Sequence, residues 1–374
     1  MKLLFISSTY PIPSAPYQGI FNGLLVQALA NEHSVRVIAP IAWTVKAVHR
    51  VAPSSDPHVT HPTFYYPPRI LRWSYGFWYW KSIQSSFRNL TKNYKPDVVL
   101  GYWAHPDSDA AVRAARSLNV PSVVLVGGSD VLILARSGLR RQVIQGVLQR
   151  ANRVVAFSED LARHVVDLGV SSDSVDVVYR GVDREVFKPA DRLESRLALH
   201  IAPNAIVLVW VGRLVDVKNP SMAIRAIVHW RQLYGDRLRI VVIGAGPLRT
   251  GLERLADQLS VRERCSFLGA IPHQEIAKWF QAADLTILTS HSEGVPNVLL
   301  ESIACGTPFI ATDVGGVREI ADPRCDKLVP AGDENAFQQA VVEKLSDSSI
   351  YQRSHSTYDL NGLACRISQI LERL

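Results

Sequence analysis

The sequence predicts an α/β protein with two doubly wound domains, each built around a parallel sheet. Short apolar runs of strand length alternate with segments of helical period along almost all of the 374 residues. Because these runs are apolar throughout, they are typical of parallel strands that helices cover on both faces. The alternating series restarts near Lys188-Pro189-Ala190-Asp191, which indicates a second domain.

The elements follow in order within each domain. In the first domain, residues 1–189, we expect strands at Leu3–Ser8, Ser34–Pro40, Asp97–Trp103, Pro121–Val126, Arg153–Phe157 and Val175–Tyr179, with helices at Ile20–Asn31, Asp107–Leu118 and Leu139–Ala151. In the second, residues 190–359, we expect strands at Ala205–Val211, Leu238–Ile243, Cys265–Leu268, Leu285–Leu288, Pro308–Thr312 and Lys327–Val329, with helices at Pro220–Tyr234, Leu248–Leu259, Gln274–Ala283 and Pro296–Cys305.

Composition argues against several other classes of protein. Hydrophobic residues make up 47% and charged residues 20% of the chain, so it can bury two cores and is not intrinsically disordered. The four cysteines are scattered without a Cys-x-x-Cys pair, which argues against a disulfide scaffold or a cysteine zinc site. No apolar run is long enough to span a membrane, and the start resembles a first strand rather than a signal peptide. We therefore expect a cytoplasmic protein.

The net charge of +7 is concentrated in the first half of the chain. Residues 1–190 contain 21 basic and 13 acidic side chains, a net of +8, whereas residues 191–374 contain 20 and 21, a net of −1. No acidic residue lies between Asp56 and Asp97, a segment with six basic ones. This imbalance indicates an anionic partner for the first half, such as a membrane surface, a phosphorylated substrate or a nucleic acid.

Ligands of doubly wound sheets bind where strands lead into helices, so the natural site is the cleft between the two domains. In the segment His291–Glu301, Gly294 allows a tight turn and Pro296 suits the first helical position. The free N–H groups of Asn297, Val298 and Leu299 would then form an anion site at the start of the helix.

Two acids, Glu293 and Glu301, frame this anion site and would accept hydrogen bonds from sugar hydroxyls. The alternative is an exposed loop acid and an ordinary acid on a helix face. In the loop Val211–Pro220, Arg213 and Lys218 would neutralise a diphosphate leaving group, with Asn219 as the helix cap, or they are simply solvated surface cations.

Two glycine-containing loops carry weaker signals. Gly244-Ala-Gly-Pro-Leu-Arg249 lacks the third glycine of a dinucleotide fingerprint, and we interpret it as a tight turn that opens a helix. Gly19 follows the loop after the first strand. It either allows the backbone to approach a phosphate or makes a simple turn.

Together these segments resemble the retaining nucleotide-sugar glycosyltransferases of family 4, glycosyl transferases group 1, over nearly the whole chain. Glu293 and Glu301 reproduce the family's Glu-x7-Glu motif, and Gly212-Arg213 followed by Lys218 is similar to its donor-diphosphate pair. The other matching segments fall in family order: Tyr179–Pro189, Gly244–Arg249, Cys305-Gly-Thr-Pro and Asp313–Glu319.

The resemblance implies a GT-B fold, with two Rossmann-like domains that face a cleft and a last helix, about 360–374, that packs back on the first domain. It implies that Arg213 and Lys218 bind the donor diphosphate and that Glu301 accepts from the ribose. Glu293, with Gly212, Gly294 and the backbone at Asn297, Val298 and Leu299, would bind the donor sugar and phosphates. Gly19 would approach the phosphate or the acceptor from the first domain.

The resemblance departs from the family pattern in the first domain. The loop at Gly127-Gly-Ser-Asp130 lacks the usual histidine, and we propose His105 and Asp130 as candidates for its catalytic role. The implied reaction is glycosyl transfer with retention, from a UDP- or GDP-sugar to a glycan or lipid-linked acceptor. It needs no enzymic nucleophile, no cofactor and no metal, and no Asp-x-Asp motif lies on a donor loop.

An aromatic and basic segment favours a membrane-linked acceptor. Phe64–Trp80 holds nine aromatic residues, and Phe64–Lys95 carries all six basic side chains of the acid-free stretch. This composition suits the inner face of an anionic membrane, although the aromatic side chains could equally pack on the sheet. No nucleic-acid motif is present.

Three other functions fit parts of the sequence. Pro247 and the missing first-strand Gly-x-Gly-x-x-Gly argue against a dinucleotide oxidoreductase. The absent loop histidine leaves open a non-catalytic nucleotide-sugar-binding relative, and a GT-B nucleotide-sugar epimerase is a further alternative. Hydrolysis or transfer of the donor separates these possibilities from a transferase.

Overall fold

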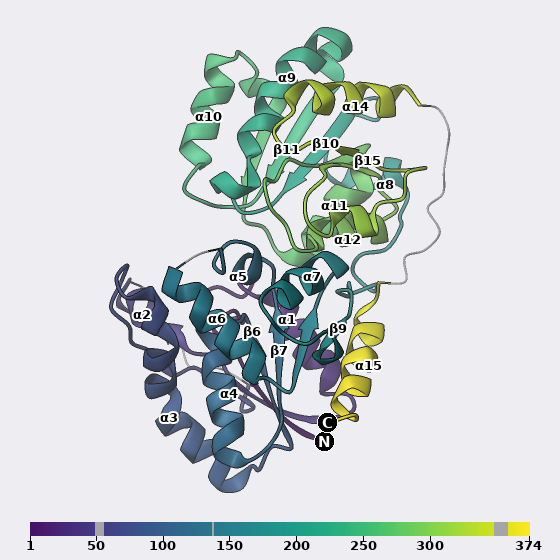
Figure 1. Cartoon of the computed structure of the whole chain (residues 1–374). Helices are drawn as coiled ribbons and strands as arrows, with labels where there is room; N and C mark the ends of the chain where they lie inside the picture. Colours follow the sequence, from purple (N-terminus) through teal and green to yellow (C-terminus); the bar gives the residue numbers. More distant parts are fainter. Residues whose placement is uncertain (49–55, 137, 348–357) are drawn as a thin grey trace. The chain divides into compact units, whose positions relative to one another are not determined.

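The computed structural model describes residues 1–48, 56–136, 138–347 and 358–374 (Figure 1). The chain divides into two compact units, residues 1–180 with 360–374, and residues 181–359. The division lies before the predicted boundary at residue 189, because the intervening segment packs on the second unit. In that segment Phe187 is buried, and its ring centroid lies 6.3 Å from that of Phe280. The Gln281 side chain donates a hydrogen bond to the Lys188 carbonyl.

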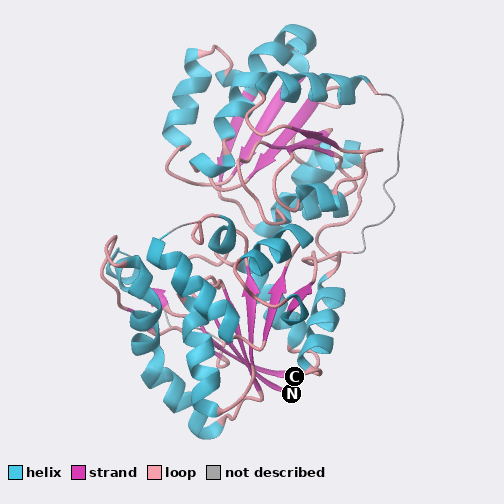
Figure 2. Cartoon of the chain, in the orientation of Figure 1, coloured by secondary structure: helices cyan, strands magenta, loops and turns pink. Residues whose placement is uncertain are grey.

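The first unit is built on a parallel sheet with the strand order β4-β2-β1-β6-β7-β8-β9. The strands of this sheet are β1 (Lys2–Ile6), β2 (Ser34–Ile38), β4 (Val59–Thr60), β6 (Val98–Tyr102), β7 (Ser122–Val126), β8 (Arg153–Ala156) and β9 (Val175–Val177). A separate parallel pair joins β3 (Ile41–Ala42) to β5 (Thr63–Phe64). Helices cover both faces of the main sheet (Figure 2).

The helices of the first unit are α1 (Ile20–Leu29), α2 (Trp43–Val48), α3 (Tyr75–Asn93), α4 (Asp107–Leu118), α5 (Ser129–Leu132), α6 (Gly138–Arg150), α7 (Glu159–Asp167) and α15 (Leu360–Leu371), with short 3-10 turns η1 (Arg72–Ser74) and η2 (Ser172–Ser174). Helix α15 lies beside α1 (Figure 1), where Leu363, Ile367 and Leu371 join Leu25 and Leu29 in one core. The sequence analysis predicted no helix over α3, although the alternative that its aromatic side chains pack on the sheet is right for Tyr79 and Phe87, which are buried.

The second unit has the strand order β12-β11-β10-β13-β14-β15, again parallel. Its strands are β10 (Ile206–Val211), β11 (Leu238–Ile243), β12 (Cys265–Gly269), β13 (Leu285–Leu288), β14 (Phe309–Thr312) and β15 (Lys327–Val329). Its helices are α8 (Arg192–Ala198), α9 (Pro220–Tyr234), α10 (Arg249–Gln258), α11 (His273–Ala282), α12 (Asn297–Ala304), α13 (Val317–Ile320) and α14 (Glu334–Ser346), with 3-10 turns η3 (Asp216–Lys218), η4 (Gly235–Arg237) and η5 (Arg262–Arg264).

Every strand predicted from the sequence is present in both units, with ends that agree to within two residues. The reason is burial on both faces: Leu3, Leu4, Phe5 and Ile6 of β1 are all buried, although consecutive side chains point to opposite faces. Parallel order within each unit brings the carboxyl ends of the strands to one edge, where the loops into the helices gather.

Arg180 is a buried cation that packs at the carboxyl ends of β6 and β8. The Arg180 guanidinium stacks on Phe157, 3.9 Å from the ring centroid, and on Phe21 at 4.4 Å. It also donates a hydrogen bond of 2.8 Å to the Tyr102 hydroxyl, and only 7% of the residue is exposed. The faces of aromatic rings attract a desolvated guanidinium. These contacts therefore hold Arg180, where the chain leaves the first unit, against β6 and the end of β8.

We expect Arg180→Ala to lower the free energy of unfolding of the first unit by about 3 kcal/mol, because it removes the stacked contacts and leaves a cavity between three rings. The measurement is urea unfolding followed by tryptophan fluorescence. Arg116→Ala, on the exposed face of α4, is the matched control and should change little. Equal effects of the two substitutions would contradict the packing role.

Candidate functional site

The loop after β10 and the loop after β13 lie side by side at the carboxyl edge of the second sheet. Strand order makes β10 and β13 neighbours, although β11 and β12 separate them in the sequence. His291 donates its N–H to the Val217 carbonyl at 2.8 Å, and the Thr289 hydroxyl donates to the Asn219 carbonyl at 2.7 Å. The loop that contains Lys218 is therefore fixed to the loop that contains Glu293.

Lys218 and Glu293, both predicted as site residues, form a close ion pair. The Lys218 ammonium lies 2.5 Å and 2.6 Å from the two carboxylate oxygens of Glu293. The Ser290 hydroxyl donates to the same carboxylate at 2.6 Å. Only 7% of the Glu293 side chain is exposed, against 24% for Lys218. A carboxylate buried to this degree needs its cation, so the pair fixes the positions of both side chains.

Arg213 contrasts with this pair. It lies two residues beyond the end of β10, and the residue is exposed. Its guanidinium makes no hydrogen bond or ion pair with any residue that the structure describes. An unpaired guanidinium beside a paired lysine leaves an excess positive charge at the loop. Its planar donors match the geometry of phosphate oxygens.

Glycines let the neighbouring loops approach the site closely. A Cβ atom on Gly244 would lie 1.8 Å from the Gly212 carbonyl oxygen, so the Gly244–Arg249 loop packs directly under the Arg213 loop. The Leu214 N–H donates to the Ala245 carbonyl at 3.0 Å. Gly315, at a φ of 55°, approaches the Glu293 carbonyl in the same way, since a Cβ there would lie 2.0 Å from it.

The start of α12 differs from the sequence prediction in two respects. Pro296 is the residue before the helix, in an extended conformation, and the first helical residue is Asn297. The Leu299 N–H donates to the Pro296 carbonyl at 3.0 Å, so it is not available to an anion as predicted. Within the described chain the N–H groups of Asn297 and Val298 have no backbone acceptor, and Asn297 Oδ1 is buried without a partner. The two N–H groups and the Asn297 side-chain oxygen are therefore the polar groups that the start of α12 can offer to a ligand.

Asn219 does not cap α9 with its side chain, as the sequence had predicted. It occupies the position before Pro220 with left-handed backbone angles (φ 44°), and its amide oxygen accepts from the Ser221 hydroxyl at 3.0 Å instead of from a backbone N–H group. Pro220 is the first helical residue, as expected. The bend at Asn219 directs the chain from Lys218 into α9.

Glu301 has a partner that the sequence analysis missed. His273, the first residue of α11, has its Nε2 atom 2.8 Å from the Glu301 carboxylate, and its ring lies 4.8 Å from that of Phe187. Burial lowers the pKa of His273, but the hydrogen bond and charge of Glu301, together with Asp183, outweigh it and raise the pKa overall. The sequence did offer a signal for His273: it follows Pro272 at the start of a helix, shortly after the end of β12.

The two candidates in the first unit are both buried. Asp130 is fully buried and accepts hydrogen bonds from the backbone N–H groups of Ala104, Gly127 and Gly128 at 2.8 to 3.0 Å. Burial raises its pKa, and these donors oppose the rise. Asp130 therefore fastens the loop after β6 to the loop after β7.

His105 is also fully buried, and its Nε2 atom accepts from the Gly76 N–H at 3.1 Å. Burial and the nearby charge of Arg140 lower the pKa of His105 to about 3, so the ring is neutral. Its Nδ1 atom is buried without a hydrogen bond of normal geometry to the described residues.

Gly19 begins α1 in the left-handed conformation, with a φ of 65°. A Cβ atom there would lie 2.5 Å from the Thr9 carbonyl carbon and 2.6 Å from the Tyr10 nitrogen. Only a glycine fits at position 19, because the chain packs closely on the loop after β1 there.

Asp107, at the start of α4, is a buried acid of the first unit. Burial raises the pKa of Asp107 to about 6, and the Tyr79 hydroxyl donates to this carboxyl at 3.1 Å.

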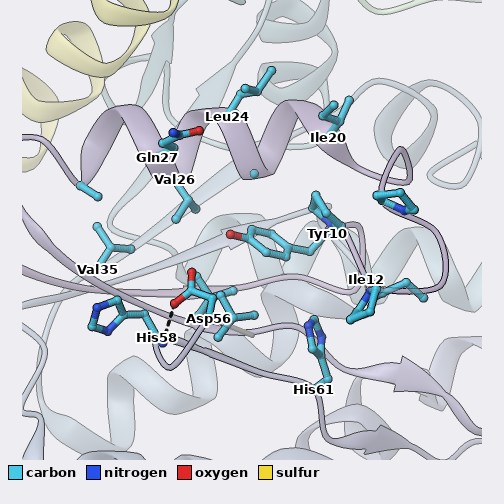
Figure 3. A pocket seen from close by; sticks show the side chains of 17 residues that line it. Tyr10, Ile12, Ile20, Leu24, Val26, Gln27, Val35, Asp56, His58 and His61 are labelled. Atoms are coloured by element: carbon cyan, nitrogen blue, oxygen red, sulfur yellow. Dashed lines mark hydrogen bonds between the residues drawn. The ribbon is translucent and has the colours of Figure 1, made fainter. Parts of the chain in front are cut away.

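A cavity of about 620 Å³ lies on the first unit, between α1, the loop after β1 and the edge of the sheet at β2 and β4 (Figure 3). Most of its lining is apolar, and its polar side chains are Tyr10, Gln27, Asp56, His58 and His61. Burial and the charge of Asp56 raise the pKa of Tyr10 to about 12, so this hydroxyl is protonated. The lining contains no lysine or arginine to bind a diphosphate.

Two features are absent from the described residues. Within them, no cluster of three His, Cys, Asp or Glu side chains has the arrangement of a metal site. Among the same residues, none of the helices combines the length and the apolar composition needed to cross a bilayer.

The raised pKa of His273 predicts a pH dependence of stability. Because the folded-state pKa lies above the usual value of 6.5, the His273–Glu301 pair stabilises the second unit at low pH, and this contribution is lost as pH rises through the folded-state pKa. Between about pH 6 and about pH 9, the melting temperature of the wild type should fall more than that of His273→Gln. His229→Gln is the control, and parallel curves for wild type and His273→Gln would refute the assignment.

Comparisons with known proteins agree with this architecture. The family profile described as Glycosyl transferases group 1 matches residues 191–357, and the profile described as Glycosyltransferase Family 4 matches residues 20–186. D-inositol 3-phosphate glycosyltransferases of Mycobacterium tuberculosis and Mycobacterium bovis are 39% identical over 180 residues. That match covers 46% of this chain and 36% of each relative, so it spans about a third of their length.

Solved structures show the same fold at low sequence identity. Sucrose-phosphate synthase from Thermosynechococcus elongatus superposes with a TM-score of 0.81 at 18% identity, covering 100% of this chain and 98% of that one. Anabaena HepE in complex with UDP-glucose has a TM-score of 0.77 at 18% identity, with 100% of both chains covered. The two family profiles and these superpositions together show that the chain belongs to the glycosyltransferases of group 1 and family 4 and has the GT-B fold.

Proposed function

We propose that this chain transfers a glycosyl unit, with retention of anomeric configuration, from a UDP- or GDP-sugar to a hydroxyl of a glycan or lipid-linked acceptor. The observation that carries the proposal is the unpaired Arg213 guanidinium beside the buried Lys218–Glu293 pair, on two loops fixed to each other. Breaking a sugar–phosphate bond leaves negative charge on the diphosphate, and positioned cations stabilise that charge in the transition state.

Lys218 would divide its three N–H donors between Glu293 and the donor diphosphate. The 24% of its side chain that is exposed leaves room for a phosphate, while Glu293 holds the ammonium in place. Arg213, which has no competing partner among the described residues, would bind the phosphates with both edges of its guanidinium. The N–H groups of Asn297 and Val298 would add donors to the same anion.

The two glutamates would then bind the uncharged parts of the donor. Glu293 would accept hydrogen bonds from sugar hydroxyls through its carboxylate oxygens. Glu301, held by His273, accepts from ribose hydroxyls. The glycosyl carbon leaves the phosphate oxygen and bonds to the acceptor oxygen on the same face, and that phosphate oxygen takes the acceptor proton. We propose that no metal ion and no enzymic nucleophile is needed.

For the first unit we propose positioning roles. The Asp130 carboxylate is occupied by backbone donors, and the His105 ring is buried and neutral, so these two residues would shape the loops that face the acceptor. Gly19 would serve in the same way, through its close packing on the loop after β1.

We also propose a cytoplasmic location at an anionic membrane, through Phe64–Lys95. Four of its aromatic side chains, Tyr65, Trp73, Phe77 and Trp78, are at least 40% exposed, whereas Phe64 and Tyr79 are buried in the core. The Lys81 ammonium lies 5.8 Å from the Phe77 ring centroid. Exposed aromatic residues with cations suit the headgroup region of a membrane, and we propose no role for nucleic acid.

Arg213→Ala should lower the rate of donor turnover about 100- to 1000-fold, equivalent to about 3–4 kcal/mol of lost charge stabilisation. Arg213→Lys should recover part of the rate, because it restores charge but not the planar donors. The assay follows release of free nucleoside diphosphate from UDP- and GDP-sugars. Release would also separate a transferase from an epimerase or a non-catalytic binding protein.

Arg254→Ala, an exposed residue of α10, is the control for this experiment and should keep the wild-type rate. Wild-type turnover by both Arg213→Ala and Glu293→Ala would show that the site is misplaced.

A nucleotide screen identifies the donor. The nucleoside diphosphate that matches the site should raise the melting temperature of the wild type, because it binds only the folded state. UDP, GDP and ADP are compared by thermal shift, and the same ligand should give a clearly smaller shift with Arg213→Ala. An equal shift in that variant would place the nucleotide away from the Arg213 loop.

A further inference from the structure

A cationic groove lies in the first unit. Its volume is about 470 Å³, and its walls come from η1 with Leu71, from the residues after α5, and from the start of α6. Arg72 and Arg140 are its charged residues, and Trp73 and Leu139 lie on its apolar walls. One wall, from Ile133 to Arg140, follows β7 and α5, so this wall lies on the carboxyl side of that strand.

The two arginines carry uncompensated charge. Neither guanidinium makes a hydrogen bond or ion pair with a residue in the described ranges, and the Nε atom of Arg140 is buried without an acceptor. Both arginines line the same groove, and burial together with the charge of Arg72 lowers the pKa of Arg140. The Tyr75 side chain has only a small opposing effect.

The sequence around the groove provides no acid to balance them. Its two wall segments lie in residues 57–96 and 131–158, and neither stretch contains an aspartate or glutamate. Other arginines of the unit have partners: the Arg153 guanidinium lies 2.7 Å from Asp176, and Arg180 stacks on aromatic rings. Two close arginines without an acid are the arrangement that binds phosphate, since each guanidinium offers paired donors to its oxygens.

The rim of the groove is apolar and exposed. Leu71 is 54% exposed, Trp73 44% and Leu139 57%, and Ile70 beside them is 61% exposed. Phe77 and Trp78, on the first turn of α3, are also exposed, by 45% and 40%. An apolar surface of this extent, next to a cationic groove, fits a phosphate that is attached to a lipid layer better than a free phosphate.

We propose that this groove binds the headgroup phosphate of an anionic membrane lipid, with Arg72 and Arg140 on the phosphate oxygens and Leu71, Trp73 and Leu139 at the headgroup–acyl boundary. The inference rests on the proposed membrane association and adds a discrete headgroup site to it. A diffuse attraction would depend on net charge alone, whereas this site depends on two particular guanidinium groups.

Vesicle flotation of the full chain tests the proposal. Vesicles of phosphatidylcholine alone are compared with vesicles that also contain phosphatidylglycerol. We expect the wild type to float only with phosphatidylglycerol, and the double variant Arg72→Gln/Arg140→Gln to bind about 100-fold more weakly. The control Arg88→Gln/Arg116→Gln removes the same charge from exposed positions on α3 and α4, and it should lose less than about tenfold.

A third double variant, Arg72→Lys/Arg140→Lys, keeps the charge and removes the planar donors, so it should remain weaker than the wild type. Thermal melting checks that all variants are folded. If both glutamine variants lose equally, or the lysine variant binds like the wild type, the headgroup site is wrong but the membrane association stands. If the wild type floats with neither vesicle, the association and the site both fail.

Discussion

The buried ion pair between Lys218 and Glu293 is the contact on which the candidate site depends. Glu293 is 93% shielded from solvent, since only 7% of its side chain is exposed, and a carboxylate in such a place is stable only beside a cation. The pair therefore joins the loop after β10 to the loop after β13. Backbone bonds reinforce the join, and glycines at 244 and 315 allow the neighbouring loops to close against it. The same pair leaves Arg213 as the cation without a partner.

Local charge, not net charge, explains how the two units differ. The second unit is close to neutral overall, yet its β10 and β13 loops present Arg213 and Lys218 together. The first unit carries the basic excess, and the groove at Arg72 and Arg140 concentrates part of it in one place. Two other buried ionisable groups of the first unit have partners within the fold. Asp130 accepts hydrogen bonds from three backbone N–H groups, and Arg180 stacks on aromatic rings.

The sheets could be predicted from the sequence, because their strands are apolar throughout. Contacts between distant segments could not be predicted in this way. Apolar runs such as Leu3–Ile6 have the same appearance in sequence and structure, because both faces of the strand are covered. The link between Lys218 and Glu293 depends on β13 inserting beside β10, which no local pattern states. The helix start at Asn297 was misplaced by one residue, because proline suits both the first helical position and the residue before it. His273 and the burial of His105 and Asp130 likewise follow from packing between segments far apart in the chain.

The most direct measurement is a crystal structure of the chain with the nucleoside diphosphate that stabilises it. The account predicts phosphate oxygens within hydrogen-bond distance of Arg213, Lys218 and the N–H groups of Asn297 and Val298, with the ribose at Glu301. A nucleotide bound elsewhere, or a guanidinium of Arg213 directed away from the phosphates, would contradict the proposed site.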